Sequence, residues 1–180
     1  SWIVEGPKPL TTKWGMVDVR DLDSDGRDDL IIPGAYYPNE PYPAVARPGY
    51  VAFNVGSGFR ADTMKFPFAS LLSIHAREYA VVDLNKDGIN DLYVADHGYD
   101  APPFPGFRNQ LFLSQDGQAQ WTDATAVLPG DWDFTHSVTT GDVNGDGNVD
   151  IFVGNNGGPM MQRSHVLFGN GAGGFAANFA

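Results

Sequence analysis

The chain has no cysteine among its 180 residues and only 11 Lys and Arg residues. Disulfides and thiol chemistry are therefore excluded. The few basic residues are spread thinly and form no cluster that could neutralise phosphates, so nucleic acid is not an expected partner. No apolar run reaches the roughly 18 residues that a membrane-spanning helix needs, and no membrane span is expected.

Turn-forming and apolar residues are abundant. The chain has 22 Gly and 13 Pro, too many for long helices and well suited to tight turns. Hydrophobic residues make up 42% and aromatic residues 13% of the sequence, which indicates a folded core rather than disorder. This composition predicts an all-β fold.

Three short acidic segments share one pattern, namely Asp21–Leu30, Asp83–Leu92 and Asp142–Ile151. Each has Asp or Asn at positions 1, 3, 5 and 9 and Gly at position 6. These oxygen side chains, together with a carbonyl at position 7, can surround a hard cation, and the glycine permits the sharp turn. One copy alone reads equally well as a solvated turn. Three copies with identical offsets favour calcium loops.

The spacing also distinguishes between kinds of metal site. An EF-hand loop ends with a Glu at position 12, where this chain has Ile32, Val94 and Val153. Magnesium prefers fewer protein ligands, and zinc prefers His or Cys, which the loops lack. We therefore expect about three Ca²⁺ ions. The predicted ligands are Asp21, Asp23, Asp25 and Asp29 with the carbonyl of Arg27; Asp83, Asn85, Asp87 and Asp91 with the carbonyl of Ile89; and Asp142, Asn144, Asp146 and Asp150 with the carbonyl of Asn148. The first loop has the most carboxylates and is expected to bind most tightly.

The loops recur at intervals of 62 and 59 residues, and short runs rich in β-branched and aromatic residues flank each one. A repeat of this size predicts a β-propeller-type array of about three four-stranded antiparallel blades. We assign the blades to residues 13–65, 66–128 and 129–180, and residues 1–12 to the outer strand of a preceding blade and its link. Three blades are too few for a closed ring, so the array is incomplete. It is either a piece of a larger propeller or a unit that assembles head to tail into a ring or filament.

The repeated motif, followed by a strand and a later Gly-x-Gly-x-Phe turn, resembles FG-GAP/VCBS-type repeats. Integrin α-subunit propellers have a similar calcium loop. The resemblance covers nearly the whole chain, and it implies a calcium-binding β-propeller whose ligands are the loop residues named above. The Phe-Gly-Gly-Ala-Pro signature of the family is degenerate here, as in Gly154–Pro159.

The formal net charge of −11 is largely a property of the loops, since ten acidic residues occupy ligand positions. Three Ca²⁺ ions would reduce it to −5. Sites of this kind fill at the millimolar calcium found outside cells, so a secreted or cell-surface location is expected. No signal peptide is visible, and the chain opens on Ser1 without a Met, which fits a processed or excised product.

Two aromatic, proline-rich insertions occupy matching places in the first two units and offer a candidate ligand rim. Loops on a rigid scaffold often bind ligands, and aromatic rings stack on sugars. The alternative is that these loops pack on neighbouring blades. His75, His136 and His165 are expected to be packing residues. The rim residues are Tyr36, Tyr37, Tyr42, Asp96, His97, Tyr99, Phe104 and Phe107, with Asn39 as a further hydrogen-bonding residue.

These observations predict a non-enzymatic, calcium-stabilised extracellular scaffold, because an Asp96–His97 pair without a nucleophile is weak support for hydrolysis. Its expected partners are further blades of the same polypeptide or other copies of the chain. Glycans or another extracellular protein are alternative partners. The competing functions are a glycan-binding lectin-like module and an accessory domain of a secreted carbohydrate-active enzyme.

Overall fold

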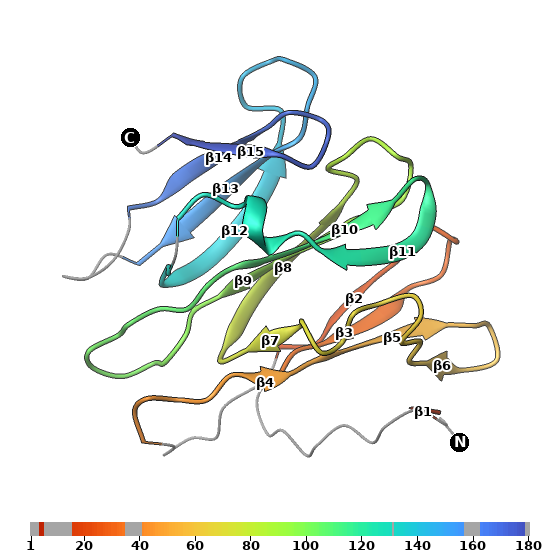
Figure 1. The fold of residues 1–180 in the computed structure, drawn as a ribbon, viewed down its shortest axis with the longest axis horizontal. Helices are drawn as coiled ribbons and strands as arrows, with labels where there is room; N and C mark the ends of the chain where they lie inside the picture. Colours follow the sequence, from red (N-terminus) through yellow and green to blue (C-terminus); the bar gives the residue numbers. More distant parts are fainter. Residues whose placement is uncertain (1–3, 6–15, 35–40, 131, 157–162, 179–180) are drawn as a thin grey trace.

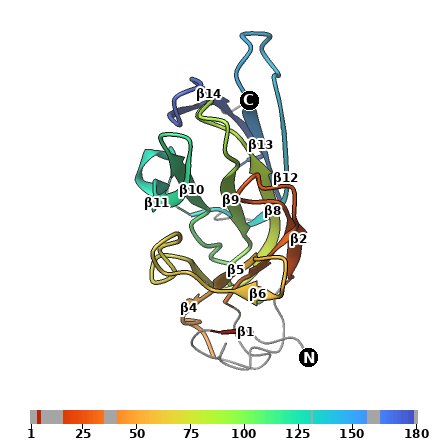
Figure 2. The same ribbon diagram turned by 90° about the vertical axis from the view of Figure 1, so that its right-hand side faces the viewer.

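The fold is known from a computed structural model that describes residues 4–5, 16–34, 41–130, 132–156 and 163–178. Strands dominate it, and the one helical element of the described residues is the short 3-10 helix η1, Thr125–Val127. The predicted all-β class is confirmed. The three main sheets follow one another along the chain and from one end of the molecule to the other (Figure 1, Figure 2).

Each main sheet contains one repeat of the acidic motif. The strands of the first are β2 (Asp18–Arg20), β3 (Asp29–Ile32), β5 (Tyr50–Asn54) and β6 (Phe59–Arg60). Those of the second are β8 (Ala76–Val82), β9 (Asp91–Asp96), β10 (Gln110–Gln115) and β11 (Gln118–Asp123). Those of the third are β12 (Thr135–Gly141), β13 (Asp150–Asn155), β14 (His165–Gly169) and β15 (Phe175–Asn178). These strands pair antiparallel in chain order, and the described strands close no ring.

Two small pairings extend this plan. Strands β4 (Arg47–Pro48) and β7 (Leu72–Ser73) pair antiparallel as a separate two-stranded sheet, which the sequence did not predict. Strand β1 (Val4–Glu5) belongs to the segment assigned to a preceding blade, and it pairs parallel with β6 at the outer edge of the first sheet. The other residues of that segment lie outside the described part of the chain.

The sheets bury two apolar cores, one at each junction. Where the first two sheets meet, the ring of Phe53 stacks on Trp121 at a centroid distance of 5.5 Å, and Phe66 lies 4.9 Å from Phe112. Where the second and third sheets meet, Tyr93, Leu111 and Ile151 are almost fully buried. Burial of one such side chain contributes about 2 kcal/mol, so the repeats stabilise one another through their shared faces.

The acidic loops and the strand ends opposite to them define two ends of each sheet. Each loop joins the first and second strands of its sheet, as the sequence predicted: β2 to β3, β8 to β9 and β12 to β13. The first strands also meet across the junction between sheets, because the backbone N–H of Val138 donates to the carboxylate of Glu78 at 2.7 Å. The repeats are therefore held in one arrangement, with the acidic loops at corresponding ends.

Candidate metal centres

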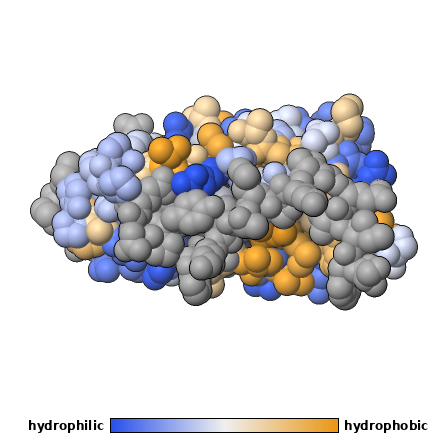
Figure 3. Space-filling view, turned by 90° about the horizontal axis from the view of Figure 1, so that it is seen from below, coloured by the Kyte–Doolittle hydropathy of each residue, from blue (hydrophilic) through white to orange (hydrophobic). Residues whose placement is uncertain are grey.

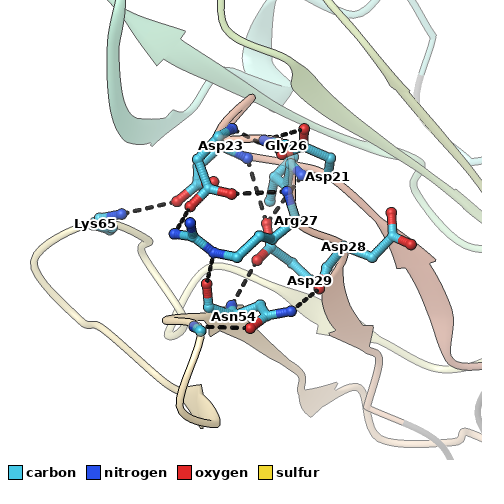
Figure 4. A network of polar contacts seen from close by, with 11 residues as sticks. Asp21, Asp23, Gly26, Arg27, Asp28, Asp29, Asn54 and Lys65 are labelled. Atoms are coloured by element: carbon cyan, nitrogen blue, oxygen red, sulfur yellow. Dashed lines mark hydrogen bonds and ion pairs between the residues drawn. The ribbon is translucent and has the colours of Figure 1, made fainter.

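The first residue of each loop folds the backbone around its own carboxylate. In the first loop, Asp21 accepts hydrogen bonds from the backbone N–H of Asp25 at 3.0 Å and of Gly26 at 2.9 Å (Figure 4). Asp83 and Asp142 accept the equivalent pair from residues 87 and 88 and from residues 146 and 147, at 2.9 to 3.2 Å. The glycine at position 6 has a φ of +82 to +89° in all three loops, a conformation that other residues adopt only with strain. The repeated sequence thus produces a repeated turn.

The Asp at position 9 connects each loop to the third strand of its sheet. Asp29 accepts the backbone N–H of Leu22 at 3.0 Å and of Asn54, at the end of β5, at 2.8 Å. In the second repeat, Asp91 accepts the N–H groups of Leu84 and Ser114, each at 2.7 Å.

The third repeat is built in the same way. Asp150 accepts the N–H groups of Val143 and Gly169, each at 2.9 Å. Sequence reasoning treated position 9 as a metal ligand alone and missed this link to the third strand. The later apolar run of each unit marked the strand, but the contact with position 9 has no sequence signal.

Burial changes the acidity of two of these carboxylates. Desolvation raises the pKa of Asp29 to about 6, although the hydrogen bonds from Asn54 and Leu22 oppose the shift. Desolvation likewise raises the pKa of Asp91 to about 6. A cation bound beside either carboxylate would favour its charged form and oppose this shift.

Three carboxylates of the first loop converge. Ligand atoms of Asp21, Asp23 and Asp29 all lie within 4.8 Å of one another. Asp23 is 8% exposed, and its Oδ1 is a buried oxygen with no hydrogen-bond partner among the described residues. A buried carboxylate oxygen without a donor costs stability unless an ion or water satisfies it. The residues thus suit an oxygen-liganded cation.

Two basic side chains also reach this loop. Lys65 Nζ lies 3.0 Å from Oδ2 of Asp23, and the guanidinium of Arg27 contacts Asp25 (Figure 4). The sequence predicted Arg27 only for its carbonyl and did not predict Lys65. Because both cations contact expected ligands, the number of carboxylates alone does not rank the first loop as the tightest site.

The second loop includes a polar residue from β10 that the sequence did not predict. Ser114 Oγ lies 3.0 Å from both carboxylate oxygens of Asp87 and donates to Asp91 at 2.9 Å. It also lies 3.5 Å from the carbonyl oxygen of Ile89, another predicted ligand. The side chain of Asn85 turns inward, since its Oδ1 accepts the N–H of Asp87 at 3.0 Å.

The third loop has the same local turn at a more exposed place. Asn144 accepts the N–H of Asp146 at 2.9 Å, and its Nδ2 donates to the Asp146 carboxylate at 3.0 Å. Asp146 in turn accepts the N–H of Asn148 at 2.8 Å, which lowers its pKa. Asp142, Asn144 and Asp146 are exposed, whereas Asp150 is buried. The oxygen groups of this loop face solvent, where an ion can reach them.

Comparison with known families matches the two later loops to described repeats. Residues 83–153 match an FG-GAP-like repeat, and residues 134–176 match an FG-GAP repeat. The chain carries FG-GAP-type repeats. Together, these matches span the second and third acidic loops and all strands from β9 to β14, and they support a β-propeller-like arrangement of the sheets. A comparison with curated proteins found no match.

The rim residues that the structure describes do not form one surface in this FG-GAP chain. Asp96 and His97 are 0% and 1% exposed, so neither side chain lies on a surface where it could contact a sugar. The carboxylate of Asp96 is occupied by backbone N–H groups, including those of His75 at 3.0 Å and Gly98 at 2.7 Å. Asp96 is therefore a structural residue that organises the strand ends.

The other rim residues divide into two groups. Phe104 packs edge-on against Phe134 at 5.5 Å, and Phe107 against Trp132 at 5.7 Å, so both contact the segment that leads into the third sheet. Tyr42 and Tyr99 form a separate pair with ring centroids 5.5 Å apart. Tyr36, Tyr37 and Asn39 lie outside the described residues. Packing on a neighbouring repeat, the alternative that the sequence left open, accounts for the two phenylalanines.

Proposed function

We propose that the three acidic loops bind Ca²⁺ and that the ions stabilise a non-catalytic FG-GAP scaffold. The observation that carries this proposal is the first loop, where Asp21, Asp23 and Asp29 converge around a buried, unsatisfied oxygen of Asp23. Calcium takes several oxygen ligands at once and would neutralise these charges. Because the position-9 Asp also holds the third strand, an ion in the loop would clamp three strands of the sheet and add to folding stability.

The proposed scaffold works outside the cell and joins further blades or other copies of the chain. Large apolar side chains remain exposed on the first sheet and its loops, among them Met16 (58%), Val17 (53%) and Val55 (51%). Figure 3 shows apolar surface between polar areas on the face seen from below. Within the described residues, no helix has the length and apolar character to cross a membrane. Exposed apolar groups on an open array support contact with another repeat.

Calorimetric titration with Ca²⁺, together with thermal melts in calcium and in EDTA, tests the proposal. We expect about three ions per chain and a lower melting temperature in EDTA. Asp23→Ala should remove one ion, whereas Asp123→Asn, a change at an exposed carboxylate at the end of β11 and outside the loops, should leave all three. Equal melts in calcium and EDTA would contradict the proposal. Light scattering in calcium separates self-association from a monomeric segment that needs further blades.

Glycan binding is a second candidate function, favoured by the Tyr42–Tyr99 pair. Tyr42 is 50% exposed, and it joins the insertion of the first repeat to that of the second. Exposed aromatic rings of this kind can stack on sugar rings. Binding to a glycan array that Tyr42→Ala abolishes would support this function, and an array without binding would count against it.

A further inference from the structure

A second set of ligand groups lies at the end of the second sheet opposite to its acidic loop. His75 comes directly before β8, and His97 directly follows β9, the strand that pairs with it. Asp100 lies three residues further on, and ligand atoms of these three residues all lie within 4.8 Å of one another. We propose that His75, His97 and Asp100 form a site for a divalent transition-metal ion such as Zn²⁺, separate from the calcium loops.

The backbone holds the two histidines in place. The N–H of His97 donates to the carbonyl of His75 at 3.0 Å. The buried carboxylate of Asp96 accepts the N–H of His75 at 3.0 Å, and of Ile74 and Gly98 at 3.0 and 2.7 Å. These bonds link the chain before β8 to the chain after β9. The imidazoles are thus presented from a rigid support, as a metal site requires.

The orientation of the His97 ring suits a metal-binding histidine. Its Nδ1 lies 3.4 Å from the carbonyl oxygen of Gly98, and its Nε2 lies 3.6 Å from Asp100 Oδ1. A metal-binding histidine usually donates one ring N–H to such a carbonyl and offers the other nitrogen to the ion. Two ligand atoms on a tetrahedral zinc ion are about 3.3 Å apart, given Zn–N distances of about 2.0 Å. The observed 3.6 Å is close to that separation.

The surroundings keep the imidazoles neutral and leave a route for the ion. Burial lowers the pKa of His75 and His97, so both imidazoles are neutral near pH 7, the form that binds metal ions. The side chain of Asp100 is 43% exposed, whereas that of His97 is 1% exposed, so the carboxylate forms the solvent side of the cluster. The group offers two nitrogen ligands and one oxygen ligand, a set typical of zinc.

The third sheet contributes a further imidazole. His136, near the start of β12, lies 4.4 Å from His97 between ring centroids. Its Nε2 is buried and has no hydrogen-bond partner among the described residues. His136 is not among the three residues whose ligand atoms lie within 4.8 Å of one another, so it borders the cluster from the third sheet, and a water molecule would take the fourth position on the ion.

Calorimetric titration of the calcium-saturated protein with ZnCl₂ tests the site, with millimolar Ca²⁺ present to occupy the acidic loops. We expect one Zn²⁺ per chain, and Co²⁺ in its place should give visible absorption bands typical of tetrahedral coordination. Asp100→Asn, a change at an exposed side chain, should weaken binding by at least about tenfold, and His75→Gln should do the same. Asp116→Asn and His165→Gln are the matched controls outside the cluster and should bind as the wild type does.

Two results would overturn the proposal. One is the absence of a one-to-one Zn²⁺ complex in the calcium-saturated wild type. The other is a complex whose affinity is unchanged in both Asp100→Asn and His75→Gln. A thermal melt of each variant in calcium shows whether it is folded, and the exposed position of Asp100 keeps the test valid if the histidine variant is destabilised.

Discussion

Lys65 Nζ lies 3.0 Å from the carboxylate of Asp23, so a cation of the chain already contacts an expected calcium ligand. Calcium binding at the first loop must displace or tolerate this charge. Replacement of Lys65 by Met removes the charge and keeps an apolar side chain near the ring of Phe53, which Nζ approaches at 4.8 Å. We expect Lys65→Met to tighten calcium binding at the first loop by about fivefold, or about 1 kcal/mol, since the lysine is partly exposed.

Calorimetry on the wild type and Lys65→Met measures this change. Arg163→Met, in the connection that leads into β14, is the control, because it alters the net charge equally at an exposed place away from the first loop. If both variants tighten binding to the same degree, overall charge rather than the Lys65–Asp23 contact is responsible.

The Asp at position 9 has a structural role that does not depend on calcium. Asp91 accepts N–H groups from Leu84 and Ser114 and a hydroxyl from Ser114. Asp91→Ala would leave these buried donors without a partner, at a cost of about 3 kcal/mol. Urea unfolding in EDTA measures the loss without any contribution from the metal. Asp146→Ala, at an exposed ligand position of the third loop, should change little in EDTA. Equal stability of Asp91→Ala and wild type in EDTA would show that position 9 is a ligand only.

Local sequence patterns predicted the repeat, its strands and the turn of each acidic loop. They succeeded because the turn depends on neighbouring residues: Asp21 binds N–H groups only four and five residues away. Short runs rich in β-branched and aromatic residues likewise predicted the strands, as in β3. The contacts that make three loops alike are therefore encoded within each loop.

Contacts between distant segments were not predictable from one sequence. Asp29 accepts from Asn54, Lys65 reaches Asp23, and no spacing rule connects these pairs. The pattern Asp96–His97 looked like a surface loop because charged and polar residues usually face solvent. Both side chains are buried, since backbone N–H groups and neighbouring rings satisfy them.

Gly98 lies where the chain after β9 passes close to a later part of the same β9–β10 connection. Its φ is +74°, and a Cβ there would lie 2.2 Å from the carbonyl carbon of Gly106. Gly98→Ala should cost about 1 kcal/mol for the backbone conformation and about 2 kcal/mol more for the overlap. Gly26→Ala is the matched control, because its φ is +87° and a Cβ would meet nothing within 4 Å. Thermal melts in calcium compare the two. A loss for Gly98→Ala no larger than that for Gly26→Ala would contradict the close approach.

The buried histidine cluster should make the metal-free protein sensitive to acid. Burial lowers the pKa of His97 from 6.5 to about 4. His136 and His75 lower it further, and Asp100 opposes them. Arg77 lowers the pKa of both His75 and His136. The unfolded chain therefore binds a proton between pH 6.5 and 4 that the folded chain does not. His97 thus contributes stability that is present above pH 6.5 and is lost as the pH falls towards 4, with a slope of up to about 1.4 kcal/mol per pH unit.

Urea unfolding in EDTA at a series of pH values tests this on the wild type and His97→Phe, which keeps a ring against Phe134. Asp29 and Asp91 have raised pKa values, so they make the free energy of unfolding change with pH in the opposite direction. Both residues are present in the two proteins, and their contribution cancels in the difference. Between pH 6.5 and 4 the wild type should lose stability relative to His97→Phe. His165→Gln, which retains the cluster, should follow the wild type. Parallel curves for wild type and His97→Phe would mean that His97 is protonated in the folded protein, and the ring contacts with Phe134 and His136 would then have to tolerate a buried charge.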